Sequence, residues 1–110
     1  MLYKVKGVSM NPTLLDGDRL WASPGEVKEG QIVIARVADI VTVGDTVYRP
    51  TRLVVKRAHS LFPARDGMRA TLVNGEGCFW KDIWAHNIVA VVRRVVWPPS
   101  RWGVDITARA

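Results

Sequence analysis

The chain has 110 residues, and 48% of them are hydrophobic, which is enough for one domain with a core of its own. That composition excludes a disordered chain, and the single cysteine, Cys78, excludes an intramolecular disulfide and a cysteine-rich metal site. The net charge of +6 is compatible with nucleic acid or an anionic membrane surface as a partner. No basic run exceeds two residues and no nucleic-acid-binding motif is present, so we expect a solvated basic surface and no nucleic acid partner.

No segment contains the roughly 18 apolar residues that span a bilayer, and "MLYKVKGV" is too short and too charged for a signal peptide. We expect the chain as given to be soluble, in the cytoplasm or peripheral to a membrane. A chain that has lost an N-terminal anchor would look the same. Trp97 and Trp102 beside Arg93, Arg94 and Arg101 leave peripheral contact with anionic lipid open, and packing of both tryptophans on the fold is the alternative.

Strand-length runs of β-branched or apolar residues recur about every ten residues. In chain order they cover residues 2–8, 19–22, 31–37, 41–43, 46–49, 52–58, 69–73 and 87–97. Turn sequences rich in Gly, Asp and Asn separate them. The pattern predicts a single all-β domain over residues 1–110, of the barrel or sandwich kind. Two prolines after Trp97 predict a tail from about residue 98, and the only helical candidate is a short turn after Ser9 that contains Pro12.

Ser9 lies between the first predicted strand and a turn, two residues after Gly7. Glycine permits unusual backbone angles and close approach by another chain, which suits a nucleophile whose own N–H stabilises an oxyanion. A serine before a turn is nevertheless more often structural. A nucleophilic serine needs a base, and neither histidine, His59 or His86, has a carboxylate partner pattern. We therefore expect both histidines on the surface.

Lys56 is the other candidate base, because it stands in the apolar run "LVVKRA". Side chains alternate along a strand, so Lys56 and Arg57 point to opposite faces, and one of them faces the interior unless the strand is an edge. Burial lowers the pKa of a lysine from about 10.4 toward neutrality, and a neutral amine is a competent base for a serine hydroxyl. From composition alone, a solvated lysine on an edge strand is the simpler interpretation.

Three stretches together resemble the signal peptidase I and LexA-like serine proteases. "GVSMNPTLLDGD" (residues 7–18) resembles their nucleophile motif G-x-S-M-x-P-T-L…G-D, "GQIVIARV" (30–37) the strand that follows, and "LVVKRA" (53–58) the lysine box. "NIVAVVRRVVWPP" resembles the closing strand of the family. The three boxes span about half of the chain. Gln31 departs from the acidic residue that is usual there, and "NGEGCFWKD" (74–82) only loosely echoes a further family box.

The resemblance implies a coiled β-barrel of short, mostly antiparallel strands, with a Ser–Lys dyad and no metal or cofactor. Ser9 would be the nucleophile and Lys56 its general base. The backbone N–H of Ser9 would form part of the oxyanion hole. Gly7 stands where some members carry a second donor, which would here come from elsewhere. Met10 would pack beside the pocket for the substrate residue that precedes the scissile bond.

The branch of the family follows from the position of the serine. Self-cleaving LexA-like and UmuD-like proteins carry a scissile Ala-Gly or Cys-Gly pair well before the nucleophile, and only eight residues precede Ser9. We therefore expect a serine endopeptidase acting in trans on a precursor protein or peptide, from which it removes an N-terminal or leader peptide. The chain looks most like small soluble signal-peptidase-like proteins, among them proteases proposed to mature nickel superoxide dismutase precursors. The alternative is a non-catalytic or self-cleaved LexA/UmuD-like β module for peptide binding or dimerisation.

Overall fold

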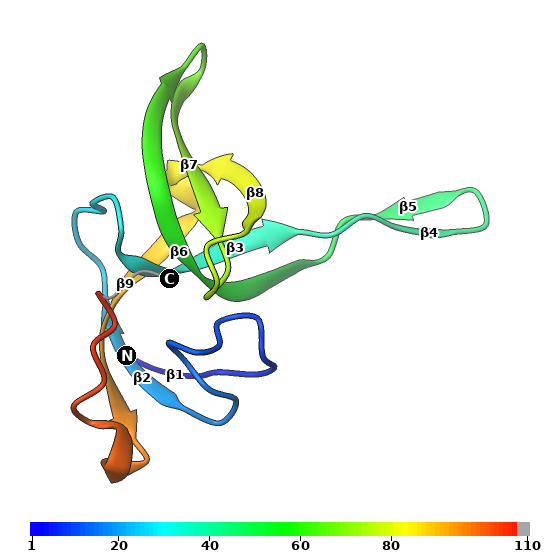
Figure 1. Ribbon diagram of the computed structural model, residues 1–110. Coiled ribbons are helices and arrows are strands. Elements are labelled where there is room, and N and C mark those ends of the chain that lie inside the picture. Colours follow the sequence, from blue (N-terminus) through cyan, green and yellow to red (C-terminus); the bar gives the residue numbers. More distant parts are fainter. Residues whose placement is uncertain (108–110) are drawn as a thin grey trace.

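The computed structural model describes residues 1–107, which form mostly antiparallel β-sheet and contain no α-helix (Figure 1). Seven strands make one sheet in the order β1-β2-β9-β3-β6-β7-β8, while β4 and β5 form a separate hairpin. The strands are β1 Leu2–Lys4, β2 Arg19–Ser23, β3 Ile32–Ala38, β4 Val41–Val43, β5 Thr46–Tyr48, β6 Thr51–Ala64, β7 Gly67–Val73, β8 Phe79–Trp84 and β9 Ile88–Trp97. Two short 3-10 helices are η1 Ala85–Asn87 and η2 Pro99–Arg101. The all-β class predicted from the sequence is confirmed, and the sheet is open, with β1 and β8 at its edges.

The central strand β3 is buried on both faces and divides the core into two clusters. Ile32 and Ile34 contribute to a first cluster with β2, β9 and the turn after β1. Val33 and Ala35 contribute to a second cluster with β6, β7 and β8. Successive strand side chains point to opposite faces, so a continuous apolar run such as "IVIA" is what a strand covered on both sides requires.

The predicted strands are present with changed ends, and one strand was not predicted. β1 stops at Lys4, because the chain turns away at Gly7, whose φ is 85°. β6 continues past the predicted end to Ala64, because it pairs with β7 as far as Gly67. β8 was missed, since its polar residues Lys81 and Asp82 interrupt the apolar pattern.

The short turn expected after Ser9 is present, but it does not extend into a helix. Residues 9–13 form turns, and a single bond of helical spacing runs from the Leu14 N–H to the Met10 carbonyl oxygen (2.9 Å). The segment closes on itself instead, because the Gly17 N–H bonds the Val5 carbonyl oxygen (2.9 Å).

Two segments lie outside the sheet. The chain leaves it after Trp97 as predicted, through η2, and positions 108–110 of the predicted tail lie outside the described residues. The β4–β5 hairpin projects away from the rest of the molecule (Figure 1), and residues 40–53 are all exposed. Within residues 1–107, no helix has the length and apolar character needed to cross a membrane.

Candidate active site

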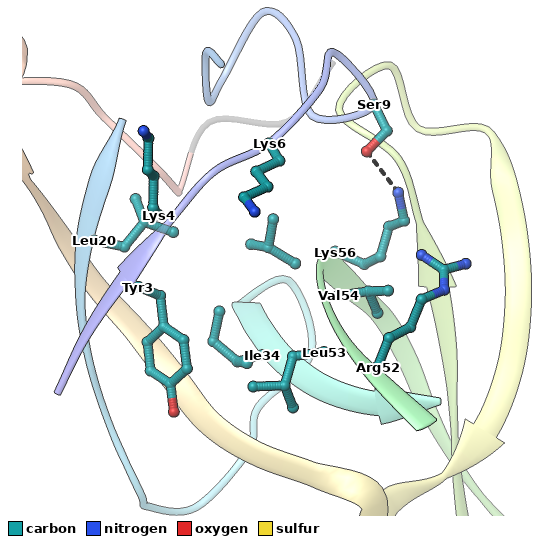
Figure 2. Close-up of a pocket in the computed structure, with 11 residues that line it drawn as sticks. Tyr3, Lys4, Lys6, Ser9, Leu20, Ile34, Arg52, Leu53, Val54 and Lys56 are labelled. Carbon is teal, nitrogen blue, oxygen red and sulfur yellow. Dashed lines mark hydrogen bonds between the residues drawn. The ribbon is translucent and has the colours of Figure 1, made fainter. Parts of the chain in front are cut away.

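The fold brings Ser9 and Lys56 into direct contact, although 47 residues separate them in the sequence. Ser9 belongs to the turn after β1, and Lys56 lies in the first half of β6. The Lys56 Nζ donates a hydrogen bond of 2.7 Å to the Ser9 Oγ (Figure 2). Ser9 is exposed, whereas Lys56 is only 6% exposed. The hydroxyl is therefore open to a substrate while its amine partner is withdrawn from water.

Lys56 is buried because β6 is an inner strand that lies between β3 and β7. The expectation that only one of the two adjacent cations would face the interior is corrected, since Arg57 is also buried, at 3% exposure. Arg57 points to the opposite face, where it donates hydrogen bonds to the carbonyl oxygens of Gly30 (2.7 Å) and Ile106 (3.0 Å). The C-terminal segment thus covers the second face of the strand and leaves neither cation to solvent.

The surroundings of the Lys56 amine disfavour its charged form. Burial lowers the pKa of Lys56 below its ordinary value of 10.5, and the nearby positive charge of Arg52 lowers this pKa further. No carboxylate within residues 1–107 forms an ion pair with Lys56. The Trp80 ring, with its centroid 5.0 Å from the Nζ, acts in the opposite sense, because an aromatic face attracts an ammonium, but the pKa of Lys56 is still lowered overall. These are the conditions under which a lysine can lose its proton and act as a base.

The backbone around Ser9 leaves N–H donors available, that of Ser9 itself among them. Within the described residues the Ser9 N–H makes no hydrogen bond, so it is free to face a developing oxyanion. The Gly7 N–H, by contrast, donates to the Asp16 Oδ1 (2.7 Å), so Gly7 offers neither a hydroxyl nor a free N–H. Met10 is fully buried in the first core cluster and does not line the pocket beside the dyad.

A third segment, which sequence reasoning did not assign to the site, supports the turn that carries Ser9. The Gly75 N–H donates to the Ser9 carbonyl oxygen (2.9 Å). A Cβ at Gly75 would lie 2.3 Å from the carbonyl oxygens of Met10 and Asn11, so only glycine allows this approach. Gly75 and Trp80 both belong to the stretch 74–82 that loosely echoes a family box, and that echo was the only signal for them.

A salt bridge fixes the other end of the same turn. The Asp18 carboxylate is 2% exposed and accepts hydrogen bonds from the Leu15 N–H (2.9 Å) and from the Arg101 guanidinium (2.9 Å). Arg101 also donates to the Thr13 carbonyl oxygen (3.0 Å). This arginine comes from η2, so the C-terminal segment holds the turn in place.

A pocket of about 300 Å³ opens beside the dyad, between the N-terminal segment and β6 (Figure 2). Ser9 and Lys56 are among its lining residues. Its floor is apolar, with Leu20, Ile34 and Val54 among the contributing residues. An open apolar pocket next to a nucleophile can hold a side chain of an extended substrate.

The other residues singled out from the sequence do not form a second site like the Ser9–Lys56 pair. His59 and His86 are exposed as predicted, and His86 stacks on Trp84. Trp97 and Trp102 are 50% and 63% exposed, so neither is packed away. Cys78 is exposed, and within residues 1–107 no cluster of His, Cys, Asp and Glu could hold a metal ion.

The chain was also compared with known proteins, and neither the family models, nor the curated proteins, nor the solved structures include a match to it.

Proposed function

We propose that this chain is a serine endopeptidase that uses a Ser9–Lys56 dyad to remove an N-terminal or leader peptide from a protein substrate in trans. The observation that carries the proposal is the 2.7 Å hydrogen bond between the exposed Ser9 hydroxyl and the buried Lys56 amine. The resemblance of residues 7–18 and 53–58 to the signal peptidase I and LexA-like proteases supports the same pair.

The chemistry follows from the two groups. Neutral Lys56 takes the proton of the Ser9 hydroxyl as its oxygen attacks the scissile carbonyl, and the Ser9 N–H stabilises the resulting oxyanion. Lys56 then returns the proton to the leaving amine, which departs and leaves an acyl-enzyme. Water activated by the same lysine hydrolyses this ester and regenerates Ser9.

The same proposal includes a coiled β-barrel of the signal peptidase kind. A signal-peptidase-like coiled β-barrel would need the open seven-stranded sheet to coil. Register shifts between β2 and β9, β3 and β9, β6 and β7, and β7 and β8 support this, because such irregularities bend and twist strands.

The proposal is tested with a serine-directed acylating probe and with pooled peptides, using mass spectrometry to locate adducts and cleavage products. The parent should be acylated at Ser9 and should cut a subset of the peptides. Ser9→Ala should lose both activities, and Lys56→Ala should lose at least a hundredfold in rate, the usual contribution of a general base.

Matched controls separate chemistry from surface changes. Ser100→Ala and Lys81→Ala replace an exposed serine and an exposed lysine, and both should behave like the parent. Cleavage by Ser9→Ala and Lys56→Ala at the parental rate would overturn the dyad. Absence of labelling at every pH would favour the non-catalytic β module instead.

A further inference from the structure

The pocket beside the dyad combines its apolar floor with a basic rim. Lys4, Lys6 and Arg52 line it together with Lys56, and among residues 1–107 no acidic residue does. Figure 2 shows the Lys6 ammonium directed into the space above the floor and the Arg52 guanidinium on the side of Lys56, whereas the Lys4 ammonium points away. Two cations therefore flank the place where a substrate side chain would lie.

These two cations are available to a ligand. Within residues 1–107, Lys6 forms no ion pair. Arg52 pairs with Asp39 at 2.9 Å, but the two side chains are 54% and 41% exposed. Exposed pairs of this kind contribute little, so a substrate carboxylate can take the place of Asp39 at small cost.

We propose that the pocket selects peptides with an acidic side chain close to the scissile bond, whose carboxylate is attracted by the positive charges of Lys6 and Arg52 while a neighbouring apolar side chain lies on the floor. The inference rests on the proposed function for the position of that bond. Hydrogen bonds between cations and a carboxylate are stronger than neutral ones. The same rim repels a lysine or arginine in the substrate, so it acts by exclusion as well as by attraction.

The experiment measures binding to Ser9→Ala, which retains the pocket but has no nucleophile. Fluorescent decapeptides are prepared in three pools that differ at one fixed position, which holds Glu, Gln or Lys, and this position is moved along the peptide from one set of pools to the next. Binding is compared by fluorescence anisotropy at low and high salt. The Glu pool should bind about tenfold more tightly than the Gln pool at its best position, the order expected of two partly exposed ion pairs. The Lys pool should bind more weakly than both, and high salt should reduce the differences.

Variants assign the effect to the two cations. In the Ser9→Ala background, Lys6→Gln and Arg52→Gln should each reduce the preference for Glu, and the double variant should abolish it. Lys28→Gln changes an exposed lysine that does not line the pocket and should leave the preference unchanged. Equal binding of the three pools, or a preference that survives in the double variant, overturns the inference.

The binding preference and the acylation of Ser9 are measured separately, so this inference and the proposed function can fail independently. Acylation of Ser9 in the parent, with no advantage for acidic peptides, would uphold the protease and overturn this specificity. A preference for Glu that depends on Lys6 and Arg52, with no acylation of Ser9, would support the acidic-peptide pocket and overturn the proteolysis.

Discussion

The buried position of Lys56 lowers the stability of the fold but suits a lysine that acts as a base. A buried ammonium costs free energy, and replacing such a group with an apolar side chain often stabilises a protein. The sheet nevertheless places this amine at 6% exposure against the Ser9 hydroxyl, with Arg52 nearby and without a carboxylate ion pair in the described part of the chain. Ionisable groups with perturbed pKa values occur preferentially at functional sites.

The lowered pKa of Lys56 predicts how acylation depends on pH. Only the neutral amine accepts the Ser9 proton, so the acylation rate should rise with pH and level off once Lys56 is deprotonated. The midpoint should fall below 10.5, because burial and Arg52 both lower the pKa. Rates of probe labelling at Ser9, measured across the pH range in which the fold is intact, check this expectation.

Arg52→Gln tests the electrostatic part of that shift. Removal of the positive charge makes the protonated form of Lys56 less unfavourable, so its pKa rises and the midpoint of the rate profile moves to higher pH. Arg49→Gln removes an exposed charge that does not line the pocket and should not move the midpoint. An unchanged midpoint in Arg52→Gln would show that this arginine does not act on the base.

At the scale of elements, the site depends on one strand of the sheet and on two connections between its strands. The turn after β1 carries the nucleophile, β6 carries the base, and the connection between β7 and β8 supports the turn through Gly75. Trp80 at the start of β8 then covers the amine. The placement of Ser9 is therefore sensitive to a residue that takes no part in the chemistry.

Gly75→Ala should separate these segments. The added Cβ would lie 2.3 Å from two backbone oxygens, which cannot move without displacing the turn. We expect a loss of about 2 kcal/mol in the free energy of unfolding, in the range for overpacked sites, together with reduced acylation of Ser9. Urea denaturation and probe labelling measure the two effects.

Gly103→Ala provides the matched control, because nothing lies within 4 Å of a Cβ built at that glycine. It should leave both stability and labelling close to those of the parent. If Gly75→Ala were equally silent, the contact with the turn could not be important for the site.

At the scale of the whole molecule, the C-terminal segment reaches back to the start of the chain. Arg101 and Asp18 are 83 residues apart in sequence, and their pair links η2 to the turn that follows Ser9. Ile106 in the same segment accepts a hydrogen bond from Arg57 on β6. Both ends of the described chain thus contribute to the surroundings of the dyad.

Arg101→Ala should destabilise the protein by about 3 kcal/mol, because it leaves the Asp18 carboxylate buried without its cation. Arg94→Ala removes an exposed arginine of β9 and should change stability by no more than about 0.5 kcal/mol. Urea denaturation of the parent and both variants gives the comparison. Equal stability of the two variants would contradict an anchoring role for Arg101.

Much of the local structure could be predicted, because strand periodicity and turn residues act over a few neighbours. The long apolar runs at residues 31–37 and 87–97 became β3 and β9, and the prolines after Trp97 ended the sheet. β8 escaped prediction, since an edge strand is half solvated and carries polar residues that hide its alternation. The turn after Ser9 was taken for a helix candidate because the local sequence does not show how the loop closes. The loop closes through a hydrogen bond from the Gly17 N–H to the Val5 carbonyl oxygen, which joins its two ends.

By itself, the sequence determined the all-β class and singled out Ser9 and Lys56, because residue types, turn chemistry and the order of motifs are written along the chain. Only the tertiary structure decided that the two side chains meet, that Lys56 and Arg57 are both buried, and that Gly75 and Arg101 hold the nucleophile turn. Burial and a 2.7 Å contact depend on which strands become neighbours. That pairing joins residues far apart in the chain, so no local pattern encodes it.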